Sequence, residues 1–205
     1  MRLPRVYIIV DSAAWLARLA AIGVQLVQLR IKEQPADTVR AEVRAARALC
    51  ASAGVQLIVN DHWQIALEEG CDFVHLGQGD LASADRAALR RAGVRLGIST
   101  HDDAELERAL AAGPDYVALG PIYPTLLKVM PWQPQGLTRI TEWKRRIGTL
   151  PLVAIGGLTL ERLAGVLAAG ADAAAVVTDI VRHEQPEARA RAWLAAAQQA
   201  PAAAA

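Results

Sequence analysis

Eight short runs of β-branched and other apolar residues alternate with segments of helical spacing along the chain. The runs expected to form strands are Val6–Val10, Gln25–Arg30, Val55–Asn60, Phe73–Leu76, Val94–Ile98, Tyr116–Leu119, Leu152–Ile155 and Ala173–Val177. The segments expected to form helices include Ala36–Ala53, Ala82–Ala92, Asp102–Ala112, Leu160–Ala169 and Pro186–Ala197. Strands that alternate with helices build parallel βαβ units. The pattern therefore predicts an α/β fold, a single (β/α)8 TIM barrel, over a doubly wound open sheet, which a count of eight strands disfavours.

Length and composition fit one domain with a large core. The chain has 205 residues, 53% of them apolar, and a formal net charge of +1. This length lies near the lower limit of about 200 residues for a TIM barrel, so few insertions are expected. We expect residues 1–197 to form the barrel and the Ala-rich segment 198–205 to be a disordered tail.

Charge and apolar patterns argue against several classes of function. The near-neutral balance disfavours a general nucleic-acid or membrane surface. No apolar run approaches the roughly 20 residues of a membrane span, and no signal peptide is recognised, so we expect a cytoplasmic protein. We also expect a monomer or a small homo-oligomer. Cys50 and Cys71 have no metal-ligand spacing and are expected to be reduced residues that pack in the core.

The second predicted strand ends in the run Gln28, Arg30 and Lys32. Side chains two residues apart along a strand lie on one face, so these three should share a side. The strand is otherwise so apolar that both of its faces should be buried. Burying an amide and two cations is costly unless an anion accompanies them. The run therefore predicts an anion site inside the fold.

Two carboxylates follow the next two strands. In a TIM barrel the site lies at the carboxyl ends of the strands, where Asp61 and Asp80 should be neighbours. Two close carboxylates need a cation between them, and oxygen ligands favour Mg²⁺ that bridges substrate phosphates. Structural salt bridges across the barrel mouth are the alternative interpretation. With Arg30 and Lys32 nearby, the pattern indicates phosphorylated small-molecule substrates and favours a diphosphate with Mg²⁺.

The last strands and the longest loop offer a second phosphate position. Gly156-Gly157 and Val177-Thr178 follow the seventh and eighth strands, where TIM barrels usually bind phosphate, although the glycines could simply form a tight turn. The irregular segment 120–136 contains Thr125 and Lys128 and has the length of a lid or binding loop. Trp132 lies in it and could cover a ligand.

No pair of a nucleophile and a base is predicted. Ser99 follows the fifth strand and has no obvious histidine partner on the neighbouring strand ends. His75 lies within the fourth strand, where a hydrogen-bonded core residue is favoured over a catalytic one. His101 is expected in the first turn of a helix, in a segment Thr100–Asp103 that resembles a capping box.

At these residues the sequence closely resembles thiamine phosphate synthases, from the first strand to the eighth. The matching motifs are Gln28-Leu29-Arg30-Ile31-Lys32, Val59-Asn60-Asp61, His75-Leu76-Gly77-Gln78-Gly79-Asp80, Gly97-Ile98-Ser99, Gly120-Pro121-Ile122-Tyr123-Pro124-Thr125, Pro134-Gln135-Gly136 and Ala154-Ile155-Gly156-Gly157. Together they are far more specific than any one of them.

The resemblance implies a transferase that joins 4-amino-2-methyl-5-hydroxymethylpyrimidine diphosphate to 4-methyl-5-(2-hydroxyethyl)thiazole phosphate, or its carboxylated form, with release of diphosphate by a dissociative route. It implies Asp61 and Asp80 as Mg²⁺ ligands. The residues implied for the pyrimidine diphosphate are Gln28, Arg30, Lys32, Asn60, Ser99 and Lys128. Those implied for the thiazole phosphate are Thr125, Leu126, Leu127, Gly157, Val177 and Thr178. The catalytic set is Arg30, Lys32, Ser99 and Lys128.

Two departures and two alternative functions remain. The final strand ends in Thr178 where the family usually has serine, so a hydroxyl is kept. The family commonly has a second threonine just before the loop lysine, where this chain has Leu127, so one hydroxyl near the thiazole phosphate is missing. A thiazole tautomerase-type isomerase shares the barrel but would not need the diphosphate cluster. A binding-only relative that senses thiamine precursors is the other alternative.

Overall fold

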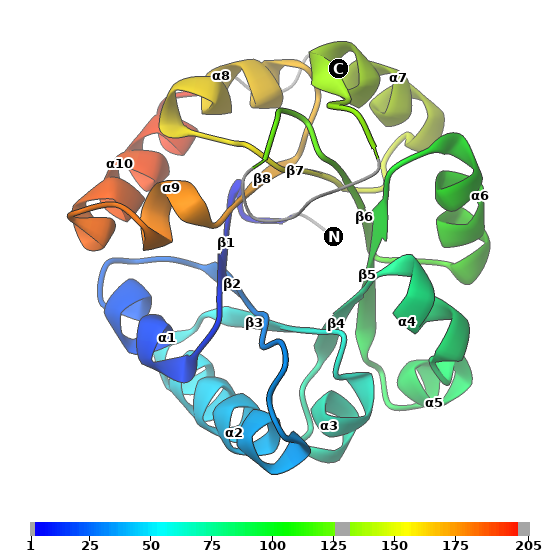
Figure 1. Cartoon of the computed structure of the whole chain (residues 1–205), viewed down its shortest axis with the longest axis vertical. Helices are drawn as coiled ribbons and strands as arrows, with labels where there is room; N and C mark the ends of the chain where they lie inside the picture. Colours follow the sequence, from blue (N-terminus) through cyan, green and yellow to red (C-terminus); the bar gives the residue numbers. More distant parts are fainter. Residues whose placement is uncertain (1–2, 126–131, 201–205) are drawn as a thin grey trace.

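Eight parallel strands close into a barrel in the computed structural model, which describes residues 3–125 and 132–200 (Figure 1). Each strand pairs with its neighbours in sequence, and β1 pairs with β8. The strands are β1 (Val6–Val10), β2 (Leu26–Leu29), β3 (Gln56–Asn60), β4 (Phe73–Leu76), β5 (Arg95–Thr100), β6 (Tyr116–Leu119), β7 (Leu152–Ile155) and β8 (Ala173–Val176). The predicted TIM barrel is confirmed, and the open sheet is excluded.

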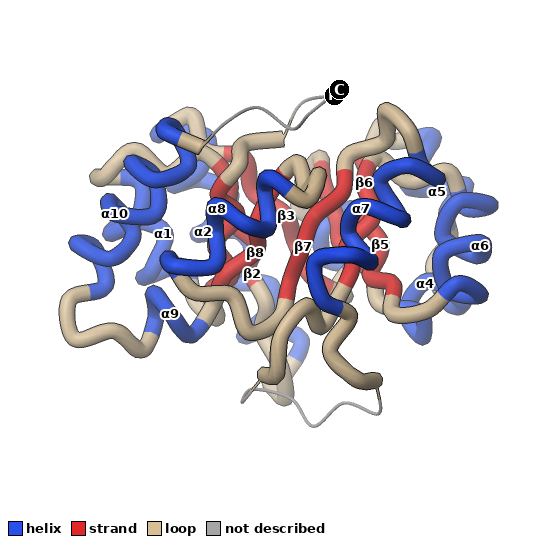
Figure 2. The backbone as a smooth tube through the Cα atoms, turned by 90° about the horizontal axis from the view of Figure 1, so that it is seen from above, coloured by secondary structure: helices blue, strands red, loops and turns tan. Residues whose placement is uncertain are grey.

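Ten helices surround the strands in the described part of the chain (Figure 2). They are α1 (Ala13–Ala20), α2 (Ala36–Ala53), α3 (Trp63–Glu68), α4 (Gln78–Ser83), α5 (Arg86–Arg91), α6 (Asp103–Ala112), α7 (Gly136–Ile147), α8 (Leu160–Ala168), α9 (Thr178–Val181) and α10 (Pro186–Gln199). None of these helices has the length and apolar character needed to cross a bilayer. Helix α10 continues two residues past the expected end of the barrel at residue 197.

The predicted helix Ala82–Ala92 is wrong. The chain forms two short helices there, because Ala84 has an extended backbone and Asp85 caps α5 by accepting a hydrogen bond of 2.8 Å from the Ala88 amide. The first of these, α4, contains Asp80 in its first turn.

The residue that caps α6 also differs from the expectation. Asp102, not Thr100, accepts a hydrogen bond from the Glu105 amide, and Glu105 accepts one from the His101 amide in return. His101 therefore precedes the helix instead of lying in its first turn.

Two apolar layers hold the barrel together. The outer layer lies between strands and helices and contains the fully buried Trp143 and Trp193. The inner layer fills the barrel with alternate side chains from the strands, among them Tyr7, Phe73 and Tyr116. Burial of this kind, at about 25 cal/mol per Å² of apolar surface, is the main force that stabilises such a fold.

The strand register places one residue without a side chain between two large ones. His75 of β4 pairs with Gly97 of β5, and Gly97 pairs with Tyr116 of β6. A Cβ atom on Gly97 would lie only 2.1 Å from Cζ of Tyr116. The Tyr116 ring therefore lies across β5, and only glycine at position 97 leaves room for it to reach His75.

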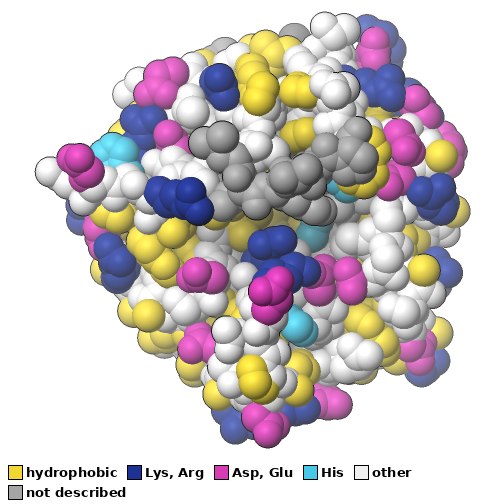
Figure 3. Space-filling view, in the orientation of Figure 1, with side chains coloured by type: hydrophobic (Ala, Val, Ile, Leu, Met, Phe, Trp, Pro, Cys, Tyr) yellow, Lys and Arg dark blue, Asp and Glu magenta, His cyan; other side chains and the backbone are white. Residues whose placement is uncertain are grey.

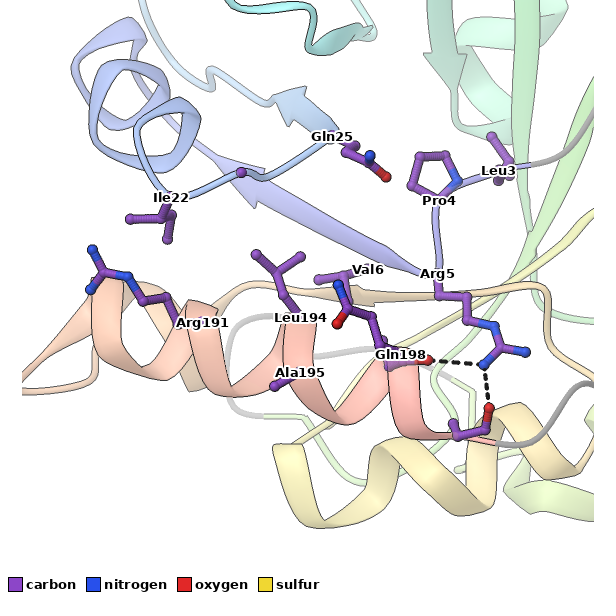
Figure 4. A pocket seen from close by; sticks show the side chains of 13 residues that line it. Leu3, Pro4, Arg5, Val6, Ile22, Gln25, Arg191, Leu194, Ala195 and Gln198 are labelled. Carbon is purple, nitrogen blue, oxygen red and sulfur yellow. Dashed lines mark hydrogen bonds between the residues drawn. The ribbon is translucent and has the colours of Figure 1, made fainter.

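A hollow of about 840 Å³ lies at the amino-terminal end of β1, beside α10 (Figure 4). Within it, Arg5 donates hydrogen bonds of 2.9 and 2.6 Å to the carbonyl oxygens of Ala197 and Ala200. The guanidinium thus satisfies carbonyl groups at the carboxyl end of α10, where a cation is favoured. This hollow is remote from the carboxyl ends of the strands and contains none of the predicted site residues.

Candidate active site

A cavity of about 350 Å³ opens at the carboxyl ends of the strands, where the predicted site should lie. Its lining combines apolar residues from inside the barrel with polar side chains from the strand ends. The polar side chains are Tyr7, Asp11, Gln28, Arg30, Asn60, His75, Ser99, His101, Thr125 and Thr178. Figure 3, which looks onto this face, shows cationic and acidic side chains side by side near its middle.

The run after β2 divides into a buried and an exposed part. Gln28 is 2% exposed and faces the barrel interior, whereas Arg30 and Lys32 follow the end of the strand and are exposed. The expectation that Arg30 and Lys32 are buried is therefore wrong, but the alternation continues past Leu29, because Gln28 and Arg30 both line the cavity while Leu29 and Ile31 both pack in the outer layer. Arg30 still lines the cavity, and Lys32 forms an ion pair with Asp61.

Asp61 and Asp80 are neighbours, as predicted, and their charges interact. Burial raises the pKa of Asp61, but the hydrogen bond and positive charge of Lys32 outweigh burial, so the net shift is downward. Burial and the charge of Asp61 raise the pKa of Asp80. Asp61 also has a left-handed backbone with φ of 63°, a conformation that is uncommon outside glycine and often marks a functional site.

A chain of hydrogen bonds runs through the barrel below the cavity. Ser99 Oγ lies 2.7 Å from His75 Nε2, and His75 Nδ1 lies 2.7 Å from the Tyr116 hydroxyl. The Tyr116 hydroxyl is 2.8 Å from that of Tyr7, which accepts a hydrogen bond of 2.7 Å from Gln28 Nε2. Ser99 therefore does have a histidine partner on the neighbouring strand, contrary to the sequence interpretation. Burial lowers the pKa of His75 to about 4, so the ring is neutral at pH 7.

The glycines after β7 have a packing role besides lining the cavity. Gly156 and Gly157 have φ of 97° and 64°, and a Cβ atom on Gly157 would lie 2.4 Å from the carbonyl oxygen of Pro124. The loop after β6 passes directly over them. Both glycines line the cavity together with Val177 and Thr178. The tight-turn interpretation and the phosphate interpretation of these glycines are thus compatible.

Trp132 stacks on a histidine at the rim. Its ring lies 3.9 Å from the His101 ring at an interplanar angle of 13°. Gln135 donates a hydrogen bond of 2.8 Å to the His101 carbonyl oxygen and ties the loop before α7 to the end of β5. His101 lines the cavity, so its partner Trp132 also lies at the rim.

Comparison with known proteins identifies the family. The family model described as thiamine monophosphate synthase matches residues 6–180. The chain belongs to the thiamine monophosphate synthase family. It is 63% identical over 196 residues to a thiamine-phosphate synthase of Rhizobium etli, with 96% of each chain covered. It is 48% identical over 176 residues to one of Serratia proteamaculans, covering 86% of this chain and 83% of that protein.

A solved structure supports the fold. The thiamine phosphate pyrophosphorylase from Pyrococcus furiosus superimposes with a TM-score of 0.85 at 23% sequence identity, and the match covers 96% of each chain. At that identity the likeness shows the barrel alone. Membership of the thiamine monophosphate synthase family rests on the family model and on the curated relatives.

The structure brings most of the predicted residues of this family member to one mouth of the barrel. Those that line the cavity are Gln28, Arg30, Asn60, Ser99, Thr125, Gly157, Val177 and Thr178. Lys32, Asp61 and Asp80 lie at the strand ends but are not among the lining residues. Leu126, Leu127 and Lys128 lie outside the described residues.

The sequence did not predict the residues that hold the site residues in place by hydrogen bonds. Tyr7 and Tyr116 both point into the barrel and join the hydrogen-bonded chain. Gln78 donates a hydrogen bond of 2.8 Å to the Ser99 carbonyl oxygen and accepts one from Arg108, which fixes the end of β5. The available signal was the inward position of two tyrosines in strands that otherwise contain only apolar side chains.

Proposed function

We propose that this family member joins the pyrimidine diphosphate to the thiazole phosphate, or its carboxylated form, to give thiamine phosphate and diphosphate. One observation carries the proposal most directly. Arg30 and the buried polar residues Gln28 and Asn60 line one side of the cavity, and the other side is lined by the glycines after β7 and by Val177 and Thr178 after β8. This lining supports the proposal that each side of the cavity holds one phosphate-bearing substrate.

The proposed reaction depends on stabilisation of the negative charge on the departing diphosphate and does not require a strong base. The amino group of the pyrimidine can stabilise the cation left when diphosphate departs, and the thiazole nitrogen already has a free lone pair. We therefore propose a dissociative reaction in which the C–O bond to diphosphate breaks before the C–N bond forms. Arg30 donates to the departing diphosphate, and Lys32 and Lys128 are proposed to add positive charge.

The residues at the ends of β3 and β4 fit a bound Mg²⁺. Within residues 3–125 and 132–200, no group of three or more His, Cys, Asp or Glu side chains is arranged to hold a metal. Mg²⁺ commonly binds through one or two carboxylates, with water and substrate phosphate completing its shell. Asp61 and Asp80 match that arrangement, because their mutual repulsion is only partly relieved by Lys32. The ion would neutralise charge on the diphosphate.

A direct assay tests the proposed reaction. The purified chain is mixed with both precursors and Mg²⁺, and thiamine phosphate and diphosphate are followed together. Equal amounts of both products are expected. Interconversion of thiazole phosphate isomers without diphosphate release would support the tautomerase alternative. Binding of either precursor to the folded chain with no product would support the binding-only alternative and contradict the proposal.

Asp80→Asn is expected to raise the Mg²⁺ concentration needed for half-maximal activity by at least about tenfold, since one of two charged ligands is lost. Titration of Mg²⁺ against activity, and calorimetric binding of Mg²⁺ in the presence of diphosphate, measure the effect. Asp37→Asn, at an exposed position in the first turn of α2, is the matched control and should leave both curves in place. Identical curves for Asp80→Asn and Asp37→Asn would remove Asp80 from the metal site.

A further inference from the structure

The hydrogen-bonded chain from Gln28 to Ser99 is almost completely shielded from water. Tyr116 is fully buried, and Gln28, Tyr7 and His75 are between 1% and 6% exposed. Gln28, Tyr7 and His75 also border the cavity but are almost wholly buried, whereas Ser99, at the end of the hydrogen-bonded chain, is half-buried. Among the described residues its hydroxyl has one hydrogen-bond partner, His75. In such a dry environment each polar hydrogen needs a protein acceptor.

The starting point of the chain determines the direction of its hydrogen bonds. Gln28 Nε2 carries only hydrogens and must donate to the Tyr7 oxygen. The Tyr7 hydrogen then has one neighbouring acceptor, the Tyr116 oxygen, and the Tyr116 hydrogen goes to Nδ1 of His75. The neutral imidazole has one N–H group, which is therefore on Nε2 and is donated to Ser99.

The opposite order leaves a buried hydrogen without an acceptor. If Tyr116 donated to Tyr7, the Tyr7 oxygen would accept twice and its own hydrogen would have no partner among the described residues. A buried donor left unsatisfied is costly, because the group loses its hydration without gaining a hydrogen bond. With Gln28 as donor, only one order satisfies every hydrogen in the chain. That order leaves the Ser99 hydrogen directed away from His75 and toward the cavity.

We propose that His75 and Tyr116 are positioning residues that make the Ser99 hydroxyl a permanent hydrogen-bond donor to the phosphorylated substrate. His75 cannot remove the Ser99 proton, because the nitrogen that faces Ser99 already carries one. Ser99 therefore is neither a nucleophile nor a base. It donates to an oxygen of the diphosphate, where negative charge grows as the C–O bond breaks. The catalytic part of this inference rests on the proposed function.

Packing holds the His75 and Tyr116 rings in place independently of hydrogen positions. The His75 and Tyr116 rings stack with centroids 5.5 Å apart, and Phe73 meets Tyr116 edge-on at 5.6 Å. Gly97 makes this arrangement possible, since any Cβ atom there would overlap the Tyr116 ring. The imidazole is thus held by ring contacts on one side and by Ser99 on the other, which is what a fixed donor direction requires.

The tautomer is measurable on the protein alone. Nitrogen-15 NMR of the imidazole groups distinguishes the two neutral tautomers, and a His75→Asn variant assigns the His75 signals among the four histidines of the chain. The Nε2–H form is expected in the wild type, and both forms are expected in Tyr116→Phe, which lacks the hydroxyl that selects between them. Finding the Nδ1–H form in the wild type would overturn the proposal, whatever reaction the protein catalyses.

Kinetics test the route through Ser99. Tyr116→Phe should lower kcat for diphosphate release about tenfold with little change in KM, as expected when about 1.4 kcal/mol of transition-state stabilisation is lost. Thr100→Val is the matched control. It removes a buried hydroxyl that donates to the Ala118 carbonyl oxygen, and this hydroxyl is one residue from Ser99 but takes no part in the hydrogen-bonded chain from Gln28 to Ser99. It should keep kcat within about twofold, a difference well below 1 kcal/mol.

A double variant separates positioning from general damage. In a Ser99→Ala background, Tyr116→Phe should have no further effect on kcat, because the group through which it acts is gone. A full additional tenfold loss in the double variant would overturn the positioning role. Were the wild type to release no diphosphate at all, the proposed function would fail, while the NMR result would still decide the direction of the hydrogen bonds.

Discussion

Replacing Arg30 with alanine is expected to lower kcat about a hundredfold to a thousandfold and to change KM much less. Arg30 follows β2, is exposed at the cavity, and forms no ion pair with any of the described residues that would hold it elsewhere. A guanidinium forms two parallel hydrogen bonds with a phosphate group and strengthens them as charge grows on the oxygens. Steady-state rates of diphosphate release at saturating concentrations of both substrates measure the effect.

Two variants sharpen this comparison. Arg30→Lys keeps the charge but loses the two-pronged geometry, so its kcat should fall between those of the wild type and Arg30→Ala. Arg90→Ala removes an exposed arginine from α5, away from the cavity, and should leave kcat unchanged. A rise in KM for Arg30→Ala with kcat preserved would show that Arg30 contributes to substrate binding alone and would contradict its assigned role.

The barrel could be predicted because strand and helix periods are local properties. The strands β1, β4, β6 and β7 begin and end where the apolar runs do. Prediction was less accurate where a strand passes into the site. β2 ends at Leu29, so Arg30 and Lys32 keep the alternating direction of the strand but lie at the exposed mouth of the barrel and are not buried. After β4 the residues Gln78 to Asp80 form the first turn of a helix, although Gly79 and Asp80 have low helix propensity and did not predict one.

The contact between Ser99 and His75 illustrates what sequence spacing leaves out. Parallel strands bring residues together laterally, and that register depends on how neighbouring strands pair. His75 and Ser99 are 24 positions apart, and no periodic pattern connects them. Asp61 and Asp80 were placed together correctly because they lie within four residues of the ends of the adjacent strands β3 and β4. Proximity between residues at strand ends is thus easier to predict from sequence than contacts between side chains inside the barrel.

Gly97 affects both the stability of the barrel and the geometry of the site, because an added Cβ atom at this position would displace Tyr116. In Gly97→Ala the new Cβ atom would lie 2.1 Å from a ring carbon of the fully buried Tyr116, so the ring has to move. Overpacking of this kind costs about 1–3 kcal/mol. Each broken hydrogen bond of Tyr116, to His75 and to Tyr7, adds about 1 kcal/mol. Urea denaturation should therefore show a loss of about 3 kcal/mol or more.

A matched glycine and a compensating variant complete the test. Gly79→Ala, in the first turn of α4 with no atom within 4 Å of the new Cβ, should raise stability by about 0.5–1 kcal/mol. Tyr116→Val in the Gly97→Ala background removes the overlapping ring, so stability should recover in part. Activity should stay low there, because the hydrogen bonds that orient His75 are still missing. Stability of Gly97→Ala equal to the wild type would show that Tyr116 adapts freely, and the fixed donor direction at Ser99 would lose its structural basis.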